Sequence, residues 1–247
     1  MTSERRKTLL LTGASRGIGH ATVKRFGAAG WRVLTVSRHP FPEDCPWEGG
    51  QESHIQIDLA DIDALPARIE EVRAKLGDGK LDALVNNAGI SPKGEGGSRL
   101  GVLETDYATW LRVFNVNLFS TALLARSLCQ ELVAAQGSIV NVTSIAGSRV
   151  HPFAGAAYAA SKAALAALTR EMAHEFGRFG VRVNAIAPGE IDTSILSPGT
   201  EEIVQREIPM RRLGKPEEVA SIIYVLCSAQ ASYVNGAEIH INGGQHV

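Results

Sequence analysis

The chain of 247 residues is poor in cysteine and has no long apolar run. Its three cysteines, Cys45, Cys129 and Cys227, lie far apart and form no Cys-x-x-C pair, which argues against a disulfide framework or a zinc site. No apolar stretch approaches the roughly 20 residues that cross a bilayer, and residues 8–11 are too few for the apolar region of a signal peptide. We therefore expect free thiols, no bound metal, no membrane partner and a cytoplasmic location.

An excess of charge is also missing. The chain has 25 Lys and Arg against 26 Asp and Glu, so its net charge of −1 gives no basic field that would attract nucleic acid or anionic lipid. We expect a small-molecule substrate instead. The length suffices for one large buried core, and no repeat, linker or low-complexity tract divides the chain. Residues 1–247 are therefore predicted to form a single domain.

Short apolar, β-rich runs alternate with helical patterns along the whole sequence. This alternation is typical of a parallel sheet covered by helices on both faces, the doubly wound α/β architecture of Rossmann type. Residues 38–53 are an exception, because three prolines and two adjacent glycines predict a long loop in place of a crossover helix. Seven strands are predicted at 7–11, 31–37, 54–57, 81–87, 137–144, 181–187 and 237–241, and helices near 17–29, 61–76, 105–134, 157–179 and 215–228.

The loop after the first predicted strand fits two incompatible motifs. Residues 13–17 match G-x-S-x-G, the turn that presents the nucleophilic serine of α/β-hydrolases, which would be Ser15. Gly13, Gly17 and Gly19 also form a glycine loop that leads into a helix, where free N–H groups and the helix dipole attract phosphate. Only twelve residues precede Gly13, so no earlier strand can supply the oxyanion hole that a hydrolase needs. The position therefore favours a bound dinucleotide, with Ser15 as a hydroxyl donor.

The end of the second predicted strand indicates which dinucleotide. Folds that prefer NAD usually place Asp or Glu about 20 residues past the glycine loop, on the ribose 2′-hydroxyl. Here the strand ends in Val36, Ser37 and Arg38, without a carboxylate. Arg38 and Arg16 are suited to grip a 2′-phosphate, although both are also compatible with solvated surface charges. The sequence thus favours NADP over NAD.

Further motifs, taken together, resemble the short-chain dehydrogenase/reductase family over nearly the whole chain, and the likeness extends to its 3-oxoacyl-carrier-protein reductases. The motifs are TGASRGIG at 12–19, Asp58-Leu59, NNAG at 86–89, Asn117, Ser144, YAASK at 158–162, and Pro188-Gly189 with Thr193. The resemblance implies cofactor contacts at Gly13, Ser15, Arg16, Gly17, Ile18, Gly19, Arg38, Asp58, Leu59, Asn87, Ala88, Gly89, Tyr158, Lys162, Pro188, Gly189, Ile191 and Thr193.

The resemblance also implies catalytic roles for Asn117, Ser144, Tyr158 and Lys162. Tyr158 and Lys162 are four residues apart and so share one face of a helix. A phenol of pKa about 10 is a poor base near neutrality, and an adjacent ammonium is expected to lower that pKa, so that Tyr158 exchanges a proton with the substrate. Ser144 would donate a hydrogen bond to the substrate oxygen. In the family, the asparagine holds a water beside the lysine.

We therefore expect an NADP-preferring oxidoreductase that transfers a hydride between the nicotinamide and a carbonyl or secondary alcohol. His151, Phe153 and Glu190 are candidate pocket residues that suggest a small polar substrate, under a lid at 190–218. The 14 positions from Ser144 to Tyr158 are one more than most family members have, so loop 147–157 should absorb an extra residue.

Two alternatives remain open. One is a 3-oxoacyl-thioester reductase, whose acidic carrier protein would require the basic patch that Arg211, Arg212 and Lys215 offer. The other is a regulator that senses NAD(P) without turnover, which would not need Tyr158, Lys162, Ser144 and Asn117 together. By resemblance, we also expect a homotetramer.

Overall fold

A seven-stranded parallel sheet forms the centre of the computed structural model, which describes residues 5–41, 50–193 and 199–247. In these residues the strand order is β3-β2-β1-β4-β5-β6-β7, and every neighbouring pair is parallel. The predicted fold class is therefore confirmed. The strands are β1 (Thr8–Thr12), β2 (Arg32–Ser37), β3 (His54–Gln56), β4 (Ala83–Asn86), β5 (Ser138–Val142), β6 (Arg182–Pro188) and β7 (Glu238–Ile241).

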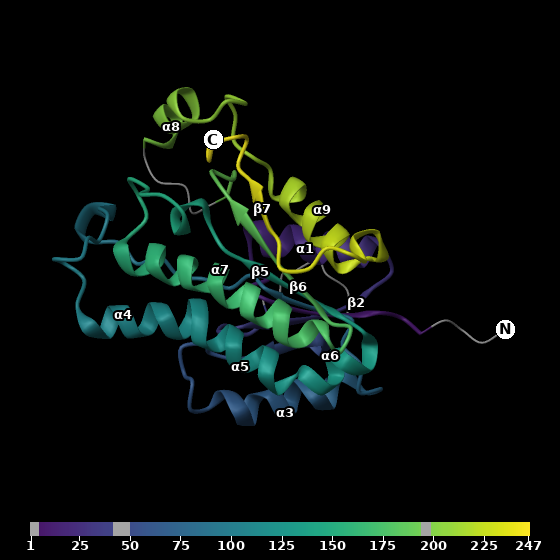
Figure 1. The fold of residues 1–247 in the computed structure, drawn as a ribbon. Helices are drawn as coiled ribbons and strands as arrows, with labels where there is room; N and C mark the ends of the chain where they lie inside the picture. Colours follow the sequence, from purple (N-terminus) through teal and green to yellow (C-terminus); the bar gives the residue numbers. More distant parts are fainter. Residues whose placement is uncertain (1–4, 42–49, 194–198) are drawn as a thin grey trace.

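Helices cover both faces of the sheet (Figure 1). α1 (Gly17–Ala28) and α9 (Pro216–Cys227) pack together on one face, and α3 (Leu65–Leu76), α5 (Ser120–Ser127) and α7 (Ala156–Gly177) lie on the other. Side chains of a strand alternate between the two faces, so the apolar run of β1 serves both cores.

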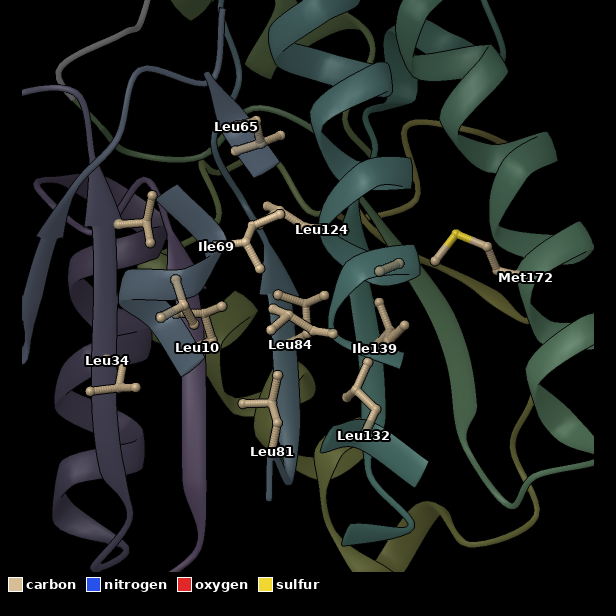
Figure 2. Packing of buried hydrophobic residues seen from close by; sticks show 14 of the residues in the cluster. Leu10, Leu34, Leu65, Ile69, Leu81, Leu84, Leu124, Leu132, Ile139 and Met172 are labelled. Carbon is tan, nitrogen blue, oxygen red and sulfur yellow. The ribbon is translucent and has the colours of Figure 1, made fainter. Parts of the chain in front are cut away.

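Leu10 of β1 belongs to the larger core, between the sheet and the helices α3, α5 and α7. Its neighbours Leu9 and Leu11 point to the core under α1 and α9. Figure 2 shows Leu10 in the larger core, with Leu84 of β4 and Ile69 of α3 nearby. All three of these side chains are at most 1 % exposed, so the sheet is a rigid support for the loops at its edge.

The prediction of a single helix at 105–134 is wrong. The chain forms α4 (Tyr107–Phe114), a π-helical turn η2 (Asn115–Phe119), α5, and then α6 (Cys129–Ala135) after a break at Leu128. Leu128 has φ −101° and ψ 16°, outside the helical region, and the axis bends there by 60°. The bend keeps the side chains of Leu124, Leu128 and Leu132 in the core.

In the described part of the chain, no single helix is long and apolar enough to cross a membrane. The pair formed by 107–127 and 129–135 reaches that length only in combination, with the 60° bend between its two parts. Its buried leucines pack against the sheet of this domain.

Two shorter differences concern loops. The expected lid at 190–218 contains a helix, α8 (Thr200–Arg206), whose apolar residues form a small cluster of their own. The loop expected at 38–53 ends in a four-residue helix, α2 (Gly50–Ser53), while 42–49, with Cys45, lie outside the described residues, as do 194–198 of the lid. The remaining elements are the short 3-10 helices η1 (Glu95–Gly97), η3 (Ile145–Gly147) and η4 (Ala229–Ala231).

Candidate active site

The loops after β1 and β4 lie side by side at the carboxyl edge of the sheet, because these strands are parallel neighbours. The Thr12 hydroxyl oxygen accepts the N–H groups of Asn87 and Ala88 at 3.1 and 3.0 Å. The Asn87 amide donates in turn to the carbonyls of Thr12 and Gly13 at 3.1 and 2.8 Å. The strand order reverses between β1 and β4, and open α/β sheets bind ligands at such a point.

The glycines of the first loop leave no room for side chains. A Cβ on Gly19 would lie 2.0 Å from the carbonyl oxygen of Gly13. Gly13 has φ +71°, and a Cβ there would lie 2.8 Å from the Cα of Ala88. Only glycine fits at both positions, so a ligand can approach the backbone closely.

The start of α1 completes this cradle. α1 begins at Gly17, and the side chain of Arg16 at the N-cap makes no capping hydrogen bond, so the N–H groups of the first turn remain available. Free N–H groups at a helix N-terminus bind phosphate, and the loop therefore fits the pyrophosphate of a dinucleotide. Ile18 packs partly buried on the core beneath.

Ser15 has none of the partners that a nucleophile requires. Its side chain is exposed, and it makes no hydrogen bond to any described residue. A catalytic serine needs a base within hydrogen-bond reach. The hydrolase interpretation of this loop therefore has no structural support.

Residues predicted at the adenosine end of the site lie next to the glycine loop or on neighbouring strands. Arg16 and Arg38 are both exposed, and the Arg38 Nε donates to His39 Nε2 at 3.2 Å. Asp58 follows β3, and its Oδ1 accepts the N–H of Ala60 at 2.9 Å, which fixes the turn that it begins. The neighbouring Leu59 is buried in the core.

Lys162 is almost fully buried in α7. Its side-chain Nζ donates to the carbonyl of Val142 at 2.6 Å, and in the described residues it has no carboxylate partner. Burial without an anion lowers the pKa of Lys162 to about 8. The Nζ also lies 3.3 Å from where a Cβ on Gly89 would be, so that glycine makes space for the cation.

Tyr158 lies one helical turn before Lys162, and the lysine Nζ is 5.7 Å from the centre of its ring. The expected lowering of the phenol pKa is not what the structure gives. Burial raises the pKa of Tyr158, a hydrogen bond with Ser144 opposes the rise, and the negative charge of Glu190 adds to it. The cost of burying a phenolate dominates, so in the protein alone Tyr158 is a neutral phenol, ready to donate a proton.

Ser144 stands two residues beyond β5, at the N-cap of η3, where its Oγ accepts the N–H of Ala146 at 3.2 Å. The hydroxyl also lies close enough to the phenol of Tyr158 to lower the pKa of that phenol. Two hydroxyl groups thus converge at the carboxyl edge of the sheet, beside the buried ammonium of Lys162. This pair can hold one carbonyl oxygen and protonate it.

Asn117 is fully buried in the π-helical turn η2. Its side-chain oxygen accepts the N–H of Ile90 at 2.8 Å, and its Nδ2 donates to the carbonyl of Ile90 and to Ser161 Oγ at 3.0 Å each. Ser161 donates on to the carbonyl of Tyr158 at 2.7 Å. Asn117 therefore ties the loop after β4 to the start of α7, while Asn115 instead donates to the carbonyl of Ala60.

The segment after β6 closes the cradle from the opposite side. The N–H of Gly189 donates to Ile241 at 3.1 Å, and Ile191 is buried and forms a bridge with Gly214. The Cγ2 of Thr193 lies 3.0 Å from where a Cβ on Gly17 would be. The structure thus places Thr193, at the end of this segment, against the glycine loop, and Pro188 ends β6.

A charged cluster lies at the same edge, and we call its three residues, Lys93, His151 and Glu190, the Lys–His–Glu cluster. His151 Nε2 and Glu190 Oε1 are 2.5 Å apart, with side chains only 10 % and 11 % exposed. Lys93 donates to the carbonyl of Phe153, and burial lowers the pKa of its ammonium while the charge of Glu190 raises it. The sequence indicated His151, Phe153 and Glu190, but Lys93 was missed because no motif contains it.

The loop 147–157 that carries His151 lies partly at the surface, as predicted for the extra residue. Ser148, Arg149 and Val150 are exposed, whereas Ala154 and Gly155 are buried. The Arg99 Nε donates to the carbonyl of Ala154 at 2.8 Å and fixes the inner part of the loop. An extra residue in the exposed part of this loop stays a prediction.

Comparisons with known proteins agree with this geometry. The family model described as Enoyl-(Acyl carrier protein) reductase matches residues 13–246. The chain is 61 % identical to Protein FixR of Bradyrhizobium diazoefficiens over 242 residues, which cover 98 % of this chain and 87 % of FixR. It belongs to the short-chain dehydrogenase/reductase family.

Solved structures of other members have the same fold. An oxidoreductase from Brucella ovis, solved in complex with a partially ordered NAD, is 60 % identical, with a TM-score of 0.84 over 96 % of this chain and all of that one. A 3-oxoacyl-[acyl-carrier protein] reductase from Brucella melitensis, solved with bound NAD, is 36 % identical, with a TM-score of 0.87 over 99 % and 93 % of the two chains. The short-chain dehydrogenase/reductase described here is therefore an NAD(P)-dependent oxidoreductase that acts on alcohol or carbonyl substrates.

Proposed function

We propose that this enzyme reduces the carbonyl of a small polar molecule with NADPH, or oxidises the corresponding secondary alcohol, with Tyr158 as the proton-transfer residue. One observation carries the proposal: Tyr158 and Ser144 lie together at the carboxyl edge of the sheet, with the buried ammonium of Lys162 5.7 Å from the tyrosine ring. A cation without a carboxylate partner is costly to bury, so its retention beside a phenol supports a catalytic role.

The residues divide the chemistry between them. A nicotinamide coenzyme bound across the glycine loop would supply or accept the hydride. Ser144 and Tyr158 hold the substrate oxygen, and the proton moves between Tyr158 Oη and that oxygen. The charge of Lys162 stabilises the phenolate that remains after donation. Asn117 acts through its bonds to Ile90 and Ser161, which hold the start of α7 in register.

Preference for NADP rests on Arg16 and Arg38. β2 ends in Ser37, so no carboxylate is available there for a ribose 2′-hydroxyl, and both guanidinium groups are solvent-exposed at this end of the site. The NAD in the Brucella ovis relative supports a nicotinamide dinucleotide in general. Guanidinium binds the additional phosphate of NADP with two charge-assisted hydrogen bonds.

Coenzyme kinetics test this preference. We expect kcat/KM for NADPH to exceed that for NADH about 30-fold, and Arg38→Ala to reduce the ratio about tenfold, since a charge-assisted hydrogen bond is lost. Arg178→Ala, an exposed arginine stacked on Phe179, should leave the ratio unchanged. Equal use of the two coenzymes by the parent enzyme would remove the proposal.

A 3-oxoacyl-thioester reductase is the nearest rival, and the name of the Brucella melitensis relative favours it. The basic patch that it needs is weakened, because Arg212 is paired with Glu218 at 2.7 Å and the carboxylate also accepts the N–H of Lys215. Assays with NADPH and a panel of ketones, aldehydes and acyl thioesters separate the two functions. We expect small ketones to be reduced faster than acyl thioesters.

The same panel tests the second rival, a regulator that binds the coenzyme without turnover. Asn117, Ser144, Tyr158 and Lys162 are together in one connected site, which such a regulator would not require. Tight coenzyme binding without oxidation by any compound of the panel would favour the regulator.

A further inference from the structure

We infer that the Lys–His–Glu cluster is the subsite that binds a hydroxyl group next to the reacting carbon of the substrate. The inference rests on the proposed function, because it names the substrate class of that same site. Lys93, His151 and Glu190 follow the three adjacent strands β4, β5 and β6, whose carboxyl ends also present Ser144. The cluster thus lies at the sheet edge where the chemistry is expected.

Glu190 is close enough to the reacting group for its charge to act on it. Its negative charge raises the pKa of Tyr158, and its backbone is fixed by the N–H of Gly214, which donates to the Glu190 carbonyl at 2.9 Å. The residue comes directly after Gly189, in the segment that lies against the glycine loop. A substrate held by Tyr158 is therefore within reach of the charge of Glu190.

The carboxylate of Glu190 has unused capacity for hydrogen bonds. An ionised carboxylate can accept about four, yet among the described residues Glu190 accepts one, from His151. The side chain is 11 % exposed, and its remaining acceptor positions are open to a donor from a ligand.

His151 fixes the orientation and the role of that carboxylate. The His151 Nδ1 accepts the N–H of Phe153 at 3.3 Å, which leaves the proton on Nε2, facing Glu190 at 2.5 Å. The imidazole Nε2–H is thus a donor to Glu190. One acceptor position of the Glu190 carboxylate is therefore taken by His151, and the other positions remain for a ligand.

The charges in the cluster select a hydroxyl over other groups. The ammonium of Lys93 and the carboxylate of Glu190 cancel, so a substrate carboxylate would be repelled by Glu190 and a substrate ammonium by Lys93. A neutral hydroxyl donates its proton to the carboxylate and offers its oxygen to the ammonium. Of the three groups, only the hydroxyl satisfies both charges at once.

Four ketones that differ in one group test this selection: acetone, hydroxyacetone, aminoacetone and pyruvate. We expect kcat/KM with NADPH to be about tenfold higher for hydroxyacetone than for the other three, as one hydrogen bond to a buried charge provides. Glu190→Ala should bring the ratio of hydroxyacetone to acetone within about twofold, Glu190→Gln should retain part of it, and Lys93→Met should reduce it about threefold. Glu217→Gln, an exposed residue in the first turn of α9, should keep the parent's ratio.

A binding measurement keeps this inference separate from the proposed function. NMR titration of the NADPH-loaded Tyr158→Phe enzyme with the four ketones should give the same order of dissociation constants, without any turnover. If no ketone oxidises NADPH but hydroxyacetone still binds about tenfold tighter, the proposed function fails and the subsite stands. If ketones are reduced but hydroxyacetone has no advantage, if pyruvate or aminoacetone binds best, or if Glu190→Ala keeps the ratio, the subsite is refuted.

Discussion

At the residue scale, the buried cation of Lys162 has opposite effects on stability and on chemistry. Burial lowers its pKa from 10.5 to about 8, so near neutrality the charged form costs the folded state about 3 kcal/mol relative to the unfolded chain. The hydrogen bond from Lys162 Nζ to the carbonyl of Val142 offsets about 1 kcal/mol of this cost. Such a balance is common where function needs a charge that the core disfavours.

Replacement of Lys162 by methionine should therefore stabilise the protein and abolish its activity. We expect a gain in the free energy of unfolding of about 2 kcal/mol at pH 7. Above the folded pKa of about 8, the unfolded chain binds the proton that the folded parent loses, so the parent's stability rises with pH and the gain disappears near pH 9.5. Urea unfolding at several pH values measures this, and a variant less stable than its parent at pH 7 would contradict it.

Tyr158 tests the chemistry more directly. We expect Tyr158→Phe to lower kcat by 10²- to 10⁴-fold, the usual contribution of a general acid or base, because the phenol is the group that can donate a proton to the substrate oxygen. Coenzyme affinity should change less than about threefold, since Gly13 and Gly19 are untouched. Steady-state kinetics and coenzyme titration measure the two effects. Turnover as fast as that of the parent would contradict the assignment.

At the scale of elements, the glycine loop and the first helix form one unit. A Cβ at position 19 would meet the Gly13 carbonyl at 2.0 Å, whereas a Cβ on Gly27, in the same helix, would meet nothing within 4 Å. Gly19 and Gly27 of α1 therefore differ in what requires them. Close packing of the glycine loop requires glycine at position 19. No contact in the described structure requires glycine at position 27.

Alanine at each position separates these roles. We expect Gly19→Ala to lower the free energy of unfolding by about 2 kcal/mol and to weaken coenzyme binding at least tenfold, because the backbone must shift. The matched change Gly27→Ala should raise stability by up to about 1 kcal/mol through helix propensity and leave binding unchanged. Thermal unfolding with and without NADPH compares the two. A Gly19→Ala protein with the parent's affinity would show that the cradle does not hold the coenzyme.

The strands were predictable from the sequence because each is a short apolar run between turn residues, and β1, β2, β5, β6 and β7 begin one residue later than expected. The π-helical turn was not predictable, since the segment 105–134 has a continuous helical pattern. The turn departs from regular α-helix at Asn117. The three side-chain hydrogen bonds of this residue go to Ile90 and Ser161, which are distant in sequence. Helix α8 was missed because it has only seven residues and packs on its own small cluster.

At the scale of the whole molecule, a band of exposed apolar side chains extends from Leu103, just before α4, to Phe119. Leu103 is 96 % exposed, Tyr107 79 %, and Leu111 and Phe119 43 % each. An apolar surface of this kind is typical of a protein–protein contact. We propose that this band lies between subunits of the homotetramer that the family resemblance implies.

Sedimentation tests the assembly. We expect the parent to sediment as a tetramer at micromolar concentration, and Leu111→Glu to sediment as a smaller species, because a charge would be buried in the contact. Glu217→Gln, outside the band, should sediment like the parent. A monomeric parent would remove the proposal.

The assembled site could be predicted only in part, since its members come from loops that the sheet brings together. Tyr158 and Lys162 were found because they are four residues apart in one helix. His151 and Glu190 are 39 residues apart, so the sequence could indicate each of them but not their pairing. Lys93 could be identified only after the strand order placed its loop beside theirs.

The π-helical turn η2 also affects which changes in length this chain can accept. The turn holds one residue more than a regular α-helix would, and it lies between α4 and the leucines of α5. The widened turn accommodates its additional residue locally, whereas deletion of a residue from the regular turn of α5 before Leu124 would rotate that side chain by about 100° and carry it out of the core. In homologous chains, insertions and deletions should therefore occur in the loop around Val150, whereas the number of residues from Tyr107 to Ser127 should stay constant.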